Sequence, residues 1–184
     1  TSKSEMLIDG EERNFGGRGG GGGAGGETKT TQHIEFIELL NTNDTPVDLS
    51  GVTISSGVDF VFPSNTILEA TSFLILAEDA VEFSATFPSM PLGTQVLQFD
   101  GSLSNGGETI TLLRPNGSIL DQVDYRSEFP WPISPNGEGS SMQLLNGIID
   151  NDLGASWRGA PPTPGIGNSV FTLGTPPAIR QVSH

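Results

Sequence analysis

Few side chains in this sequence could serve as catalytic bases near neutral pH. The two histidines are His33, which flanks an apolar run, and His184, which ends the chain. A Ser–His triad needs a serine held on a strained turn, and the sequence has no Gly-x-Ser-x-Gly elbow. Cysteine is absent, which excludes thiol catalysis, zinc–thiolate sites and disulfides. We therefore predict no catalytic residue and no enzyme.

Two carboxylate pairs have a spacing that invites comparison with glycoside hydrolases, which use two acidic side chains. They are Glu35 with Glu38 and Asp121 with Asp124. Residues three apart on a regular strand point to opposite faces, so only a bulge could bring the first pair together. Solvated strand or turn residues are the better interpretation of both pairs.

The segment Asp150-Asn151-Asp152 is the most plausible metal feature. Two carboxylates and an amide in a loop suit Ca²⁺, which prefers oxygen ligands. The EF-hand pattern is incomplete, because no Gly stands at its sixth place and no Glu closes it. An Asx-type turn is the competing interpretation. Asp44 and Asp48 form a weaker second candidate.

Three aromatic residues could bind a ligand by stacking. Trp131, Trp157 and Tyr125 lie in the C-terminal half of the chain and could form a platform for sugars. Aromatic residues in this part of a β-sandwich also serve as lids that close one end of the core. Both interpretations remain open from the sequence.

These side chains lie on or between short β-prone runs that are separated by turn residues. This pattern predicts a β-sandwich or β-barrel. The expected strands cover residues 33–40, 47–49, 52–54, 58–62, 67–68, 73–76, 96–99, 109–113, 118–123 and 142–145. A shift in apolar phase between Phe36 and Ile37 predicts a bulge. Asn116-Gly117 predicts a hairpin.

Two segments depart from the strand pattern. Residues 78–87 predict one short amphipathic helix that ends before Pro88 and caps the sandwich. Residues 1–31 form a leader with a possible strand at 6–8 and a flexible, Gly-rich loop at 16–26.

The charge distribution bears on the partners of the chain. Its 184 residues carry a formal net charge of −14, and no Lys or Arg falls between Lys29 and Arg114. Such a surface repels nucleic acid and disfavours anionic membranes, because both bind through Lys and Arg. No apolar run approaches the roughly 20 residues of a membrane span. We expect no nucleic-acid partner and no membrane insertion.

Several segments match one known pattern in their order and spacing. They are Glu35-Phe36-Ile37-Glu38-Leu39 with Asn41, Val47 to Gly51, Phe62-Pro63, Gly101 to Glu108, Val123 to Tyr125, Trp131-Pro132, Asp150-Asn151, Ser156 to Arg158 and Thr163 to Asn168. Together they resemble the lamin tail domain family, in its bacterial secreted or surface form. The resemblance covers about residues 33–168. It implies an all-β, immunoglobulin-like sandwich without enzymatic activity. For the family's first strand, Glu5 to Ile8 is the available candidate.

These observations predict three parts: residues 1–31 as the leader, 32–168 as the sandwich, and 169–184 as a linker to a following domain. The expected function is a structural or interaction module of a larger secreted or cell-surface bacterial protein. Its partners would be other domains of the same polypeptide or extracellular polymers, and no cofactor beyond a possible Ca²⁺ is expected. The alternative is a carbohydrate-binding module, with or without a requirement for calcium.

Overall fold

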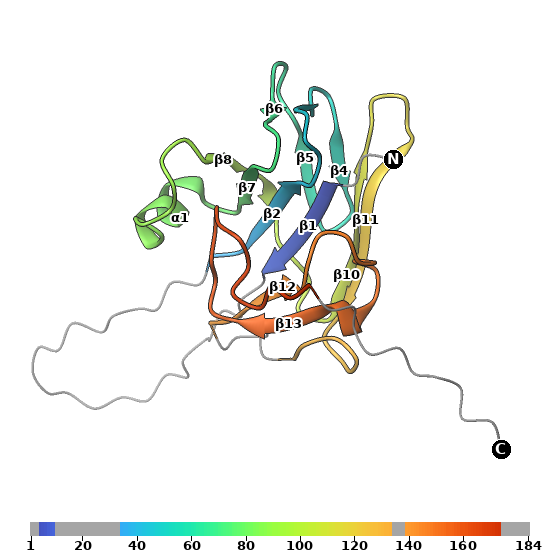
Figure 1. Cartoon of the computed structure of the whole chain (residues 1–184). Coiled ribbons are helices and arrows are strands. Elements are labelled where there is room, and N and C mark those ends of the chain that lie inside the picture. The colour runs from blue at the N-terminus through green and yellow to red at the C-terminus, as the bar shows by residue number, and fades with distance from the viewer. Residues whose placement is uncertain (1–3, 10–33, 134–138, 174–184) are drawn as a thin grey trace, which may run out of the picture.

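Two facing sheets form the body of the molecule (Figure 1). The computed structural model describes residues 4–9, 34–133 and 139–173, and for residues 4–9 it describes the backbone alone. One sheet has six strands in the order β13-β12-β1-β2-β7-β8, and the other has five in the order β11-β10-β4-β5-β9. A small ladder of β3 (Val47–Asp48) and β6 (Ile67–Leu68) stands beside them. The Gly-rich segment at 16–26 lies outside the described residues.

The six-stranded sheet joins distant parts of the chain. Its strands are β1 (Ser4–Asp9), β2 (Phe36–Asn41), β7 (Phe73–Ala77), β8 (Gln95–Gln98), β12 (Ser141–Leu144) and β13 (Trp157–Ala160). All neighbours are antiparallel except β7 and β8, which run parallel. β1 lies between β2 and β12, so the possible strand at residues 6–8 is confirmed and occupies the middle of the sheet.

The five-stranded sheet is built around one hairpin. Its strands are β4 (Thr53–Ser55), β5 (Val58–Val61), β9 (Asp100–Gly101), β10 (Gly107–Leu113) and β11 (Ile119–Arg126). β10 and β11 are joined by the Asn116-Gly117 turn, as predicted. The Arg114 amide donates to the Ser118 carbonyl at 2.8 Å, and the Gly117 amide donates to the Arg114 carbonyl at 2.8 Å.

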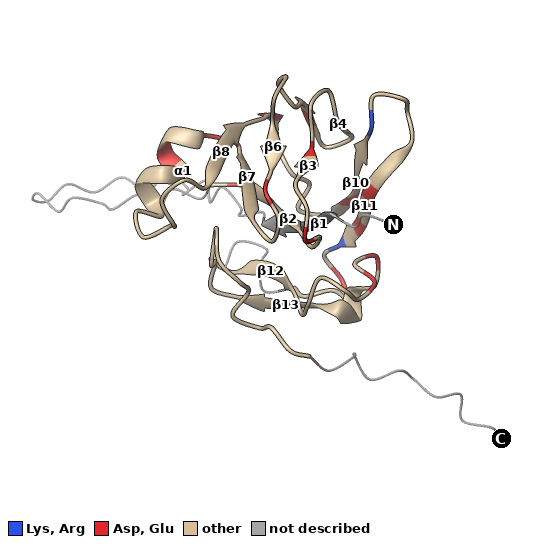
Figure 2. Ribbon diagram, turned by 45° about the horizontal axis from the view of Figure 1, so that its top comes forward, with Lys and Arg blue, Asp and Glu red and all other residues tan. Residues whose placement is uncertain are grey.

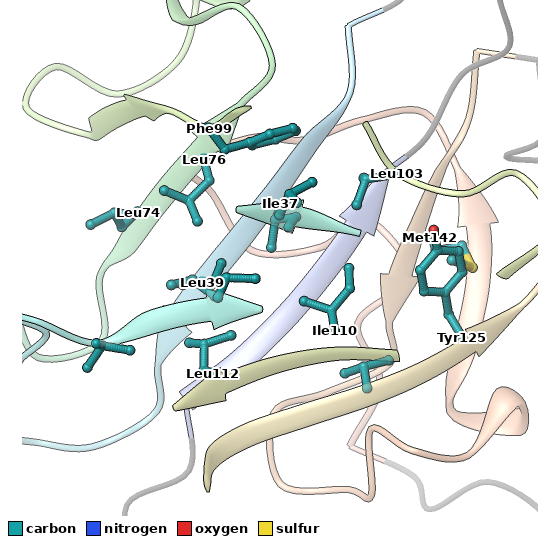
Figure 3. Packing of buried hydrophobic residues seen from close by; sticks show 14 of the residues in the cluster. Ile37, Leu39, Leu74, Leu76, Phe99, Leu103, Ile110, Leu112, Tyr125 and Met142 are labelled. Carbon is teal, nitrogen blue, oxygen red and sulfur yellow. The ribbon is translucent and has the colours of Figure 1, made fainter. Parts of the chain in front are cut away.

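The main core lies between the two sheets (Figure 3). Ile37 and Leu39 of β2 alternate with outward residues, as the period of a strand requires, and face Ile110 and Leu112 of β10 (Figure 3). The other buried members are Leu49, Val52, Ile54, Val58, Phe62, Leu68, Leu74, Leu76, Phe99, Leu103, Val123, Tyr125, Trp131, Met142, Leu144 and Trp157. One continuous apolar interior therefore holds both sheets together.

The outer face of β2 and β7 is also buried, under the helix α1 (Ala80–Thr86). Phe83 of the helix is completely buried and packs edge-on against Phe36, with 5.0 Å between ring centroids. The predicted bulge between Phe36 and Ile37 is wrong, because β2 pairs in continuous register with both neighbours. The apolar phase shifts there because β2 has two buried faces, and not because an extra residue is inserted.

The helix begins where the sequence supplies a capping side chain. Asp79 Oδ1 accepts hydrogen bonds from the amides of Val81 and Glu82, both at 2.9 Å, which satisfies two donors that the first turn leaves free. The prediction of one short helix that caps the sandwich is confirmed, with bounds slightly inside 78–87. Across the described part of the chain, no helix is long and apolar enough to cross a membrane.

Candidate functional site

The paired carboxylates considered for glycoside hydrolysis hold different loops. Glu35 Oε2 accepts from the Leu103 amide at 2.6 Å, and Glu38 Oε1 accepts from the Gly165 amide at 2.7 Å. Both side chains are buried. Their oxygens satisfy backbone donors that would otherwise be costly to bury. Glu35 thus anchors a loop to the residue before β2, and Glu38 anchors another to the strand itself.

The carboxylates of the second pair, Asp121 and Asp124, also bind different side chains. Asp121 accepts from Asn151 Nδ2 at 3.1 and 3.2 Å. Asp124 accepts from Thr109 Oγ1 at 2.8 Å and from the Arg126 guanidinium at 2.6 Å. These contacts fasten the outer strand β11 to its neighbours, and they agree with the interpretation of these acids as strand residues.

Asn41, at the end of β2, is completely buried, and its side chain makes five hydrogen bonds. Its amide nitrogen donates to the carbonyls of Thr45 at 2.8 Å and of Leu68 and Glu69 at 3.0 Å. Its oxygen accepts from the backbone and the side chain of Asn43, at 3.0 and 2.8 Å. One side chain thus fixes both the loop after β2 and the strand β6.

The segment Asp150-Asn151-Asp152 forms a turn that covers the free edge of β11. Asp150 Oδ1 accepts from the Asp152 amide at 3.0 Å, the pattern of an Asx turn. Asp152 Oδ1 accepts from the Asp124 amide of β11 at 2.9 Å. Across residues 34–133 and 139–173, no group of three or more His, Cys, Asp or Glu side chains could hold a metal ion. The arrangement gives no support to calcium binding, and we do not propose it.

The three aromatic candidates lie in the core. Trp157, Tyr125 and Trp131 are 1%, 5% and 7% exposed. The two indole rings lie 5.9 Å apart, and Trp157 Nε1 donates to the Asn151 carbonyl at 2.8 Å. They therefore do not form an exposed stacking platform, because their faces are covered by core residues and by Gly154, which contacts Trp131. Their burial in the core agrees with the alternative interpretation, in which they close one end of the sandwich.

Tyr125 fixes the turn at residues 103–108. Its single hydroxyl hydrogen is shared between two acceptors, the Ser104 carbonyl at 2.7 Å and Glu108 Oε1 at 2.9 Å. The same Glu108 oxygen accepts from the Ser104 amide at 2.7 Å. Burial raises the pKa of the Tyr125 phenol well above its usual value, and the nearby negative charge of Glu108 raises it further.

Buried amides tie the C-terminal segment to β12. Gln143 donates to the Pro161 carbonyl at 2.8 Å and accepts from the backbone and hydroxyl of Ser169 at 3.0 and 2.9 Å. Asn146 Nδ2 donates to the Thr172 carbonyl at 2.8 Å. Hydrogen bonds to the sandwich thus reach four residues beyond the predicted boundary at 168. Residues 174–184 lie outside the described part.

Sequence reasoning did not single out one group of exposed apolar side chains, which we call the C-terminal apolar group. Its members are Phe129, Ile148, Leu153, Phe171 and Leu173, all more than half exposed. The loops that carry them are bound to one another. Thr172 donates to the Leu145 carbonyl at 3.0 Å, and Gly154 packs on Trp131. Their residue types do not predict this exposure, because an apolar residue in a loop can be either buried or exposed.

Acidic side chains lie on both sheets and on α1 (Figure 2). In the described part of the chain the basic residues are Arg114, Arg126 and Arg158. Arg126 pairs with Asp124 at 2.6 Å, and Arg158 donates to the carbonyls of Ala155 and Trp157. Arg126 and Arg158 thus bind groups close to them in the chain, and most other charged side chains of the described part are acidic.

Two sheets packed over one apolar interior, with all but one strand pair antiparallel, define an all-β, immunoglobulin-like sandwich. The model of the Lamin Tail Domain family matches residues 18–127, which is more than half of the chain. The chain belongs to the lamin tail domain family. No curated protein and no solved structure matches it. Lamin tail domains are non-enzymatic, immunoglobulin-like domains. The segments at 150–168 that resemble the family lie beyond the matched part.

Proposed function

We propose that this chain is a non-catalytic interaction module of a larger secreted or cell-surface bacterial protein, and that it contacts another folded domain of the same polypeptide. The observation that carries the proposal is the C-terminal apolar group. Single exposed apolar residues are common on protein surfaces, but several on interconnected loops are typical of a contact surface.

The charges near this group favour a partner of one type. Glu128 precedes Phe129, and Asp150 and Asp152 lie between Ile148 and Leu153, all with exposed side chains. Exposed acidic residues therefore flank the exposed apolar residues along the chain, which fits a partner surface that is apolar and basic. The same acidic charge supports the expectation that the chain does not bind nucleic acid.

The buried polar residues support a role without catalysis. Glu35, Glu38, Asn41 and Gln143 are all buried, and their side chains bind loop backbone. Such groups position loops and do not face a substrate. The carbohydrate-binding alternative rested on aromatic rings that prove to be buried, so we do not propose it here.

Site-specific photo-crosslinking in the full-length polypeptide tests the contact surface. A photoreactive residue replaces Ile148, which is 82% exposed, or Val61 of β5, which is 63% exposed and serves as the control. We expect crosslinks to a neighbouring domain from position 148 and few from position 61. Equal yields at the two positions, or none at either, would contradict the proposed surface.

A glycan array probed with and without Ca²⁺ tests the class of partner. We expect no saccharide signal above background in either condition. A strong, calcium-sensitive signal would favour the carbohydrate-binding alternative instead. Generic hydrolase assays on the same chain test the absence of catalysis, and turnover lost on substitution of a single carboxylate would contradict it.

A further inference from the structure

The chain contains several Asn–Gly dipeptides, which can react without an enzyme. In such a dipeptide the glycine nitrogen can attack the asparagine Cγ, because glycine has no Cβ to shield it and permits the required backbone rotation. The new N–Cγ bond closes a succinimide ring and ammonia leaves. Water then opens the ring to Asp or isoAsp. The described residues hold three such dipeptides, at Asn105, Asn116 and Asn146.

Asn146 is protected by burial and by hydrogen bonds at both ends of its amide. It is 6% exposed. Its nitrogen donates to the Thr172 carbonyl at 2.8 Å, and its oxygen accepts from the Ile148 amide at 3.1 Å. Rotation of this side chain toward Gly147 would break both bonds, including one that holds the C-terminal segment.

Asn116 is exposed but held by the hairpin turn. Its oxygen accepts from the amide and the hydroxyl of Ser118, at 3.0 and 2.8 Å. The nucleophile, the Gly117 nitrogen, donates to the Arg114 carbonyl at 2.8 Å, and Gly117 has φ of +80°. Attack would require the turn of the β10–β11 hairpin to open.

Asn105 has neither protection. It is exposed, and its side chain makes no hydrogen bond within the described part of the chain. The Gly106 nitrogen donates only a long bond, 3.2 Å, to Ser104 Oγ, which is a weak restraint. The proton that this nitrogen loses on attack leaves with the ammonia. The space beside Gly106 is open, since an added Cβ would meet only Ser104 Oγ, at 3.7 Å.

We propose that Asn105 is a site of self-modification, where the chain forms a succinimide and then Asp or isoAsp without an enzyme. The three sites share the Asn–Gly dipeptide and differ in their restraint, so Asn105 reacts ahead of Asn116 and Asn146.

Modification at this position acts on the turn that Tyr125 holds. The Gly107 amide donates to the Ser104 carbonyl at 3.1 Å across Asn105 and Gly106. IsoAsp adds one methylene to the backbone inside this closed turn, which displaces the Ser104 carbonyl from the Tyr125 hydroxyl. Asp or isoAsp also adds a negative charge close to Glu108 in sequence.

Timed incubation of the whole chain at mildly alkaline pH, followed by peptide mapping and enzymatic methylation of isoAsp, measures the three rates. In the folded chain we expect Asn105 to react about tenfold faster than Asn116 or Asn146. In concentrated urea the three rates should converge, because the restraints are lost. Gly106→Ala should slow the reaction at residue 105 about tenfold and leave the rate at Asn116 unchanged.

Two results would overturn the assignment. One is an equal or faster reaction at Asn116 or Asn146 in the folded chain. The other is a folded chain in which Asn105 stays intact while the same residue reacts in urea. A Gly117→Ala control separates the two sites, since it should not change the rate at Asn105.

Discussion

The substitution Asn41→Asp tests how much of the fold depends on one buried side chain. It changes the size of the residue little but replaces the nitrogen that donates to Thr45, Leu68 and Glu69 with an oxygen. The oxygen that accepts from Asn43 is kept. The change therefore removes donors without creating a cavity.

The expected cost follows from these contacts. The Asn41 Nδ2 group has two hydrogens, which its three carbonyl contacts share, so the lost hydrogen bonds amount to about 1–3 kcal/mol. Three carbonyls then face a carboxylate in a completely buried position, which adds to the loss. We expect the free energy of unfolding to fall by about 3–5 kcal/mol, and the melting temperature by roughly 6–20 °C.

Asn116→Asp is the matched control for this experiment. The Asn116 oxygen accepts two hydrogen bonds, and its nitrogen donates none in the described part of the chain. A carboxylate can accept both, so the change should stay within about 0.5 kcal/mol. Urea unfolding followed by the fluorescence of the buried tryptophans measures both variants. A difference below about 1 kcal/mol between them would refute the reasoning.

Further predictions concern the turn at 103–108 and the helix. The Tyr125 pKa is raised in the folded chain, so unfolding becomes easier as the pH rises above about 10, where the unfolded phenol ionises first. Tyr125→Phe should lower the free energy of unfolding by about 1–3 kcal/mol at neutral pH. The same substitution should reduce the loss of stability at alkaline pH, as measured by unfolding curves at several pH values. Gly107→Ala should lower the free energy of unfolding by about 2–4 kcal/mol, because the added Cβ would lie 2.5 Å from the Tyr125 carbonyl oxygen. Gly93 has a similar φ but open space around it, so Gly93→Ala is the control and should cost about 1 kcal/mol. Thermal melting measures both. Phe83→Ala should cost about 3–5 kcal/mol and expose the β2 and β7 amides near α1 to hydrogen exchange; unchanged exchange there would show that the helix does not protect this face.

Much of the strand order follows from the alternation of residues and from turn chemistry. The β10–β11 hairpin was predictable because Asn116-Gly117 separates two β-prone runs. Two strands were missed for a physical reason. β9 has only two residues, Asp100 and Gly101, and both are typical of turns. β13 contains Arg158 and Gly159, which do not favour a strand, and it forms one because it pairs with β12. Such strands depend on their partners and not on local propensity.

The candidate site was less predictable than the fold, because burial decides the role of a polar or aromatic residue. From the sequence, Glu38 could be a carboxylate exposed in a cleft or one buried beneath a loop, and nothing in the sequence distinguishes the two. Only the position of Gly165, 127 residues away along the chain, shows that this carboxylate is an anchor. Likewise, Trp131 and Trp157 could have been an exposed platform or a lid, and their ring contact inside the core decides between them.

The central position of β1 bears on where this domain can be cut. A fragment trimmed to residues 18–127 keeps β2, β7 and β8 but loses β1, β12 and β13, which is half of the larger sheet. Its β2 would then present an unpaired, apolar edge, which invites aggregation. A fragment that keeps the whole sheet and its hydrogen bonds to the C-terminal segment therefore has to include Ser4 and Thr172.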